Sequence, residues 1–152
     1  MVTTIDNLST LIDQIEYKID HAPQYNRSSH DLRQENLKLL KNLYNKLEIS
    51  KKHNHFIDIF EYKAMNLSGI GLKDEDFGQI REGKYVQIIS ISYELNEKEK
   101  RVAKNTSLGY FGKAEKLLAE LKKDIIEFVL RWRYEKAFQH TEHYQRLLKK
   151  LH

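Results

Sequence analysis

Residues 114–132, AEKLLAELKKDIIEFVLRW, decide the fold that this sequence predicts. Six apolar residues in this stretch alternate at spacings of four and three, and we call them the apolar seam: Ala114, Leu118, Leu121, Ile125, Phe128 and Trp132. Such spacing is typical of a helix that packs along one line against a partner. Leu117, Ile126 and Val129 widen the line into the broad apolar face of a core helix. We therefore expect the seam to form the centre of the domain.

The pattern changes at the end of the seam. Glu135 and Gln139 occupy the next two seam positions, where apolar residues would continue the line. A second apolar face follows them: Phe138, Tyr144, Leu147, Leu148 and Leu151. The sequence therefore predicts either a bend near residues 139–141, with Thr141 as a helix cap, or one helix that changes partners. The whole amphipathic tract covers residues 112–152.

Two further helices are expected in the N-terminal third. The first has an apolar face with helical spacing, formed by Ile5, Leu8, Ile12, Ile15 and Ile19. Thr4 or Asp6 can cap its start, and it ends before Pro23, because the proline ring pushes the preceding residue out of helical geometry. The second, over roughly residues 31–51, begins at a pair that resembles a capping box. Joined by a polar loop, the two helices are expected to form an antiparallel hairpin over residues 4–51.

One β-strand is expected, over residues 84–95. Ile89, Ile91 and Tyr93 alternate there with serines, and β-branched residues dominate. A lone strand leaves backbone groups unpaired, so this strand needs a partner. The candidates are residues 55–62, residues 67–71 or the same strand of a second chain.

The rest of the middle region, residues 52–111, is expected to be irregular. Residues 55–62 favour a short helix, residues 96–105 a helical turn or exposed loop, and residues 107–112 a glycine-flanked aromatic turn. The sequence thus predicts a single domain over residues 1–152 that is mainly α, in an α+β arrangement. Its parts are an N-terminal helical hairpin, a small central β element around residues 84–95, and a long C-terminal amphipathic helix or broken helix.

Composition limits the class of protein. Of the 152 residues, 40% are hydrophobic and 32% are charged, which is typical of a globular domain. The longest apolar runs span three or four residues and the N-terminus lacks a signal-peptide pattern, so we expect a cytoplasmic protein with no membrane partner. The chain has no cysteine, which excludes disulfides and thiolate chemistry. Abundant Ile, Lys, Asn and Tyr suggest an AT-rich bacterial genome or mobile element.

Three groups of residues resemble parts of known cofactor or metal sites, but none has the complete pattern. Gly69-Ile70-Gly71 lacks the third glycine of a dinucleotide-binding fingerprint. The acidic triplet 74–76 lacks calcium-loop spacing. His140 and His143 share a helix face, but His53 and His55, the nearest further ligands, lie far away in sequence. We therefore expect no cofactor and no metal.

A partner-binding surface is predicted instead. The net charge is +4, and its positive excess lies entirely in residues 95–152. Cations and aromatic residues interleave there around Trp132, and the candidate binding residues are Arg131, Arg133, Tyr134, Lys136, His143, Tyr144 and Arg146. The leading hypothesis is a non-enzymatic protein-interaction domain, such as a small regulator, adaptor or inhibitor, that docks through a helix and can form a homo-oligomer. The alternative is a nucleic-acid-binding protein that uses residues 95–152. These charged residues can also be the solvated flanks of a buried helix.

One pair of residues suggests a specific activity. Arg133 and His140 lie two turns apart on the predicted helix, separated by six residues. This pair resembles the Arg and His motif of HEPN-family ribonucleases, in which a dimer brings two copies together to cleave RNA by acid–base chemistry. The resemblance implies a catalytic role for Arg133 and His140. The sequence departs from the family at Tyr134, which replaces the usual polar residue, and in its predicted central strand.

Overall fold

The computed structural model describes residues 4–20 and 28–152, and side chains over residues 7–16 and 28–152. The chain divides into two compact units, one ending at Leu32 and one beginning at Arg33. In the first unit, α1 (Thr4–Asp20) has the expected helical form. Its four described apolar side chains are each about half exposed: Leu8, Leu11, Ile12 and Ile15. Pro23 lies outside the described residues.

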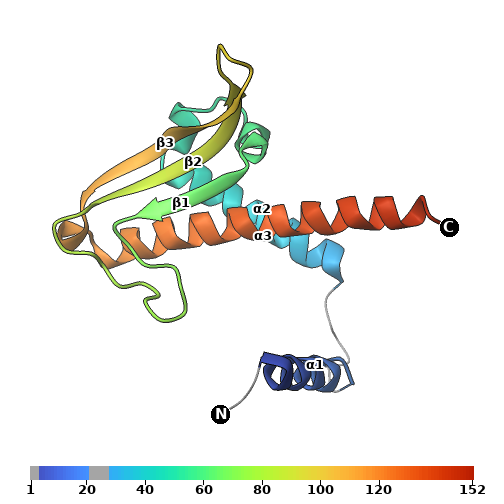
Figure 1. Ribbon diagram of the computed structural model, residues 1–152. Coiled ribbons are helices and arrows are strands. Elements are labelled where there is room, and N and C mark those ends of the chain that lie inside the picture. Colours follow the sequence, from blue (N-terminus) through green and yellow to red (C-terminus); the bar gives the residue numbers. More distant parts are fainter. Residues whose placement is uncertain (1–3, 21–27) are drawn as a thin grey trace. The chain divides into compact units, whose positions relative to one another are not determined.

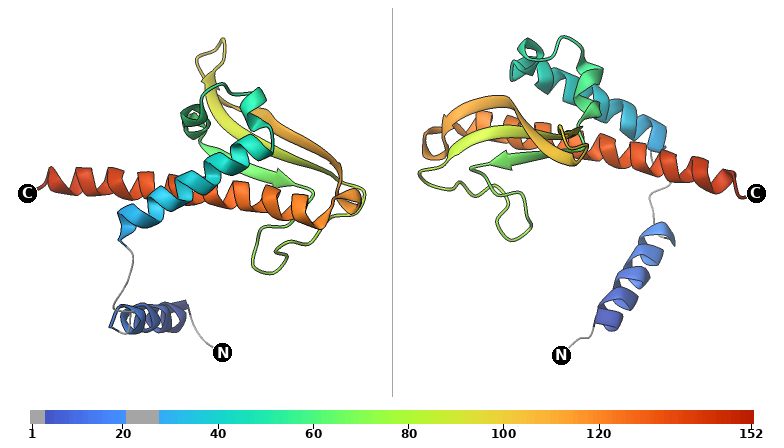
Figure 2. Two further views of the ribbon diagram at one scale, coloured as in Figure 1. Left: turned by 180° about the vertical axis from the view of Figure 1, so that it is seen from behind. Right: turned by 45° about the horizontal axis from the view of Figure 1, so that its top comes forward.

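The second unit contains most of α2 (Ser29–Lys46), a three-stranded sheet and the long helix α3 (Ala119–Lys149). The strands are β1 (Ala64–Ser68), β2 (Tyr85–Leu95) and β3 (Arg101–Lys113). They are antiparallel and follow one another in the order β1-β2-β3. Figure 1 shows α3 running along the sheet and continuing past it, and α2 crosses α3 in both views of Figure 2.

The predicted fold class was wrong. The sheet has strands of 5, 11 and 13 residues, where a small β element was expected. The expected N-terminal hairpin is not shown, because α1 and most of α2 belong to different units. The expected alternative of a broken C-terminal helix is also corrected, since α3 is continuous through residues 139–141. The Thr141 hydroxyl donates a hydrogen bond to the carbonyl of Ala137 inside this helix, so Thr141 is not a cap.

The largest correction concerns β3, which was expected to be loop and turn. Asn96 accepts backbone hydrogen bonds from Lys98 and Lys100 through its side-chain oxygen, and Glu99 has a positive φ of 59°. These features close a tight turn that brings β3 back along β2, with Ser90 opposite Thr106. The expectation that β2 needs a partner was correct. The candidate segment 67–71 overlaps β1 and pairs with β2 through Leu67 and Ser68, and the second partner, β3, was not among the candidates. The predicted short helix at residues 55–62 is a 3₁₀ helix, Phe56–Glu61.

The core lies between one face of the sheet and the two helices. The sheet contributes Val86, Ile88, Met65 and Leu108, and all four are at most 1% exposed. The seam of α3 meets them through Ile125, Phe128 and Trp132, together with Val129. α2 adds a third set to the same core, formed by Leu40, Leu43 and Tyr44, and Leu47 joins it from the turn that follows α2.

The seam differs from its prediction at one end. Leu118 is 75% exposed, because α3 begins only at Ala119. Ala114 is buried but belongs to a short 3₁₀ helix, and Leu117 is extended. Among the described residues, none of the helices combines the length and apolar character needed to cross a lipid bilayer.

Replacing Ile125 with alanine tests the core directly. Ile125 is fully buried, so Ile125→Ala is expected to lower the free energy of unfolding by about 2–5 kcal/mol, through lost burial and a residual cavity. Leu118→Ala is the matched control and is expected to cost less than about 0.5 kcal/mol. Urea unfolding measures both changes. Equal costs would mean that α3 does not pack with this face inward.

Candidate docking surface on the C-terminal helix

The contact between α2 and α3 continues past the apolar core with polar residues. Asn36 is 1% exposed. Its side-chain amide donates a hydrogen bond to the Arg131 carbonyl at 2.9 Å and accepts one from the Arg131 guanidinium at 3.0 Å. Arg131 is also paired with Glu127 one turn earlier. Both polar groups of the Asn36 side chain therefore have a partner, so the burial of this side chain costs little free energy.

A charged cluster follows one turn further along α3. Glu135 is 2% exposed, and its carboxylate accepts hydrogen bonds from Arg33 on α2 at 2.7 and 2.9 Å. Gln139 donates to the same carboxylate, and Glu142 accepts a further bond from Arg33. Hydrogen bonding to Glu135 raises the pKa of Arg33 above its ordinary value and outweighs the opposing effect of burial. Glu135 and Gln139 thus continue the seam as polar contacts.

Three side chains of α3 bind backbone carbonyls beside the sheet. The Trp132 indole donates to the Ile59 carbonyl at 2.8 Å, and the Arg133 guanidinium donates to the Met65 carbonyl at 2.9 and 3.2 Å. Lys136 donates to the Phe60 carbonyl at 2.9 Å. Burial lowers the pKa of Lys136, and repulsion from Lys63 lowers it further.

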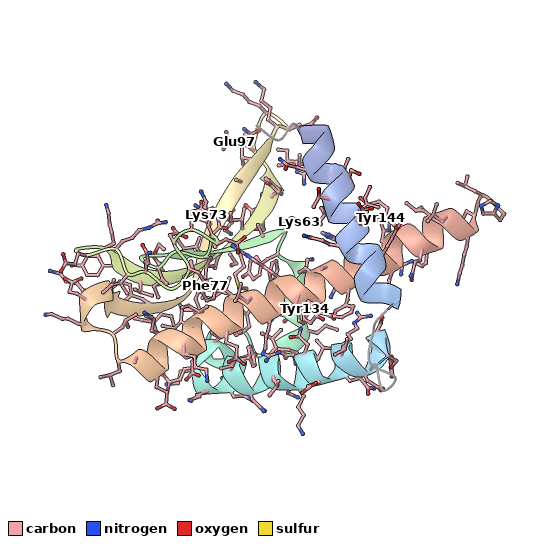
Figure 3. All side chains as sticks on the ribbon, turned by 90° about the horizontal axis from the view of Figure 1, so that it is seen from below. Lys63, Lys73, Phe77, Glu97, Tyr134 and Tyr144 are labelled. Atoms are coloured by element: carbon pink, nitrogen blue, oxygen red, sulfur yellow. The ribbon has the colours of Figure 1, made fainter. Side chains whose placement is uncertain are left out.

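These contacts divide the predicted binding residues into two groups. Arg131, Arg133 and Lys136 hold α3 against its neighbours. Tyr134, His143, Tyr144 and Arg146 are exposed. Figure 3 shows Tyr134 where α3 lies beside α2, and Tyr144 farther along α3.

The resemblance to HEPN ribonucleases receives no further support from the geometry of its two residues. Arg133 donates to the Met65 carbonyl and to the Asn66 side chain. His140 is exposed on α3, and within the described chain no hydrogen bond joins it to Arg133. Both residues lie on the continuous helix α3.

The last ten residues, 143–152, are all exposed, and we call them the distal segment. Four of their side chains follow the spacing of one helix face and form what we call the distal stripe: Tyr144, Leu147, Leu148 and Leu151. Their exposed fractions range from 43% to 76%. No hydrogen bond or ion pair joins a side chain of this segment to any other element in the described part of the chain. All four were predicted, with Phe138, as a second apolar face, and Tyr144 is the one member of the stripe that was also named as a binding residue.

A second group of polar residues lines a cleft of about 450 Å³, formed by His53, Asp58, Glu61, Tyr62 and Ser92. The Tyr62 hydroxyl and the His53 Nε2 lie 2.8 Å apart, and the Tyr44 hydroxyl donates to the His53 carbonyl. Burial raises the pKa of Tyr44, and the nearby charge of Asp58 adds to this shift. Sequence reasoning missed this group, although four of its members lie between residues 53 and 62, because the sequence does not show that they face one another and Ser92 across a cleft. Across residues 7–16 and 28–152, no set of three His, Asp or Glu side chains is placed to hold a metal ion.

Comparison with known proteins gives no relative: no family model, no curated protein and no solved structure matches this chain. A fold in any case does not specify a function by itself. The function therefore has to be argued from the surface that the structure presents.

The contact between Arg33 and Glu135 can be tested by removing one partner. Arg33→Met leaves the buried carboxylate of Glu135 without its cation, so it is expected to lower the free energy of unfolding by about 3 kcal/mol. The double variant with Glu135→Met is expected to recover most of this loss, because neither charge is then buried alone. Chemical unfolding of both variants measures the difference.

The matched control for Arg33→Met is Lys51→Met. Lys51 forms an ion pair with Glu48, and both side chains are at least 66% exposed. Its loss is expected to cost less than about 1 kcal/mol, because water screens such a pair. A similar cost for Arg33→Met and Lys51→Met would refute a structural role for the cluster around Glu135.

Proposed function

We propose that this protein is a non-enzymatic interaction domain that binds another protein by inserting the distal segment of α3 into a groove. It acts as a small regulator, adaptor or inhibitor. The observation that carries the proposal is the exposure of the distal stripe: Tyr144, Leu147 and Leu148 lie on the part of α3 beyond the core, and Leu151 lies in the turn that follows it. Contiguous exposed apolar surface of this kind is typical of protein interfaces.

The spacing of the stripe indicates how it binds. Tyr144, Leu147, Leu148 and Leu151 stand at positions i, i+3, i+4 and i+7, which is the pattern of a helix lying in a hydrophobic groove. Burying the three leucines would contribute on the order of 5 kcal/mol. A micromolar complex requires about 8 kcal/mol, so the partner must also contact the flanks of the helix.

The charge of these flanks identifies the chemistry of the partner. Arg146 and Lys149 lie on α3 and Lys150 follows its last residue, and within the described residues none of the three is in an ion pair. The last acidic side chain before them, Glu142, is bonded to Arg33. A groove with an apolar floor and an acidic rim therefore complements this segment best.

The charges on the rest of the basic region favour protein over nucleic acid as the partner. Lys104 is paired with Glu94, and Arg131 is paired with Glu127. Arg133 and Lys136 donate to carbonyls of their own chain. Fewer cations therefore remain to neutralise phosphates than the sequence suggests, and phosphate neutralisation provides most of the affinity in nucleic-acid binding.

Site-specific crosslinking tests the docking proposal. A photo-crosslinking amino acid replaces Gln145, beside the stripe, and the protein is expressed in cells of its natural host. We expect a protein adduct that disappears when Leu147 and Leu148 are both changed to glutamine, with the fold retained. The purified partner is expected to bind in titration calorimetry, and increasing salt is expected to weaken the complex.

The control for this variant removes apolar side chains elsewhere. Ile57 and Leu118 are 74% and 75% exposed, so changing both to glutamine removes similar apolar surface outside the distal segment. This control is expected to keep the adduct. Identical adducts from the two double variants would refute docking through the distal stripe.

A separate measurement addresses nucleic acid. The protein is mixed with labelled single-stranded RNA and double-stranded DNA at about 50 mM and about 200 mM salt. Because Lys104, Arg131, Arg133 and Lys136 of the basic region are engaged with groups of their own chain, we expect weak retention and no cleavage of RNA. Tight binding that falls steeply with salt would instead favour the nucleic-acid alternative, and cleavage abolished by Arg133→Ala would favour the ribonuclease.

A further inference from the structure

A second candidate site lies near the middle of α3, where Arg133 lines a cleft together with residues of the loop between β1 and β2. A cleft of about 370 Å³ opens there, at the small end of the range for ligand pockets. Its apolar walls are Leu67, Ile70 and Leu72, and Ile70 is 1% exposed. Figure 1 shows the loop extending away from the sheet past α3, and Figure 3 labels Lys73 and Phe77 on it.

The loop that forms one wall of this cleft is fixed by its own contacts. Gly71 exchanges backbone hydrogen bonds with Gln79 and Gly78, both at 2.9 Å. A Cβ atom at Gly71 would lie 2.4 Å from the backbone oxygen of Asp76, so only glycine fits there. The Asp76 carboxylate accepts the backbone N–H of Lys73 at 2.9 Å. The acidic triplet is therefore part of a closed turn.

The cleft carries an excess of positive charge. Lys73, Arg81 and Arg133 line it, and Asp76 is the one acidic residue among its lining side chains. Arg81 is paired with Asp76 at 3.3 Å, which neutralises both. Lys73 and Arg133 are left without a carboxylate partner among the described residues, so two positive charges face the cleft.

The position of Arg133 is set before any ligand binds. Its Nε and one terminal nitrogen donate to the Met65 carbonyl, and that terminal nitrogen also lies 3.4 Å from the side-chain oxygen of Asn66. These acceptors are uncharged, so they do not compensate the positive charge, and within the described residues the other terminal nitrogen donates no hydrogen bond. A cation held in this way loses little freedom when it binds an anion, which favours affinity.

We propose that this cleft binds a small phosphomonoester. A phosphomonoester carries a charge of roughly −1.5 to −2 at neutral pH, which matches the two uncompensated cations. Lys73 and Arg133 contact the phosphate oxygens, and the walls formed by Leu67 and Leu72 contact the organic part of the ligand. This site is separate from the distal stripe, so changing Leu147 and Leu148 to glutamine leaves its affinity unaltered.

Titration calorimetry at constant ionic strength tests the proposal with two probes, phenyl phosphate and inorganic phosphate. We expect phenyl phosphate to bind about tenfold more tightly, because its ring covers the apolar walls. Lys73→Gln and Arg133→Gln are each expected to weaken phenyl phosphate by about tenfold or more. Lys73 is exposed, so its variant keeps the fold even where the Arg133 variant disturbs the Met65 contact.

Lys98→Gln is the matched control, since it removes one exposed cation from the turn between β2 and β3, outside the cleft. It is expected to leave the affinity for phenyl phosphate within twofold of the original. Absence of binding at millimolar phenyl phosphate would overturn the proposal, and so would equal losses for Lys73→Gln and Lys98→Gln. Equal affinities for the two probes would overturn the assignment of an ester and leave inorganic phosphate as the ligand.

Discussion

The second unit depends on the burial of one face of α3 between the sheet and α2. Phe128 and Val129 are fully enclosed there, and the Trp132 indole donates to the Ile59 carbonyl from within the core. A three-stranded sheet alone has one face that must be covered, and α3 covers it. The same packing places Arg133 beside β1 and directs the rest of the helix past the sheet.

The two candidate surfaces follow from how this packing ends. Along α2 the apolar contact changes to Asn36 with Arg131 and then to Arg33 with Glu135, so α3 remains attached without further apolar burial. After Glu142 every residue is exposed, including the apolar side chains of the distal stripe. The docking proposal is thus a consequence of a helix longer than the core it stabilises.

The cations of α3 differ in their partners along the length of the helix. Arg131, Arg133 and Lys136 are bound to carbonyls or carboxylates of the same chain, while within the described residues the cations after Glu142 are not. Arg133 belongs to both groups, because it contacts the Met65 carbonyl and also lines the cleft beside Lys73. The region of positive excess in the sequence therefore contains cations that hold α3 in place, a candidate anion-binding residue and a docking segment.

The sequence by itself determined the core helix, the need of residues 84–95 for a strand partner and the apolar character of the last turns, because these depend on local periodicity. It did not determine β3, whose pairing depends on a turn closed by Asn96, nor the exposure of Leu118, which depends on where α3 begins. Glu135 looked like an interruption of the seam until its partner Arg33, about a hundred residues away, was placed beside it. Which side chains are buried, paired or left free is decided by contacts between distant segments, and only the tertiary structure brings these together.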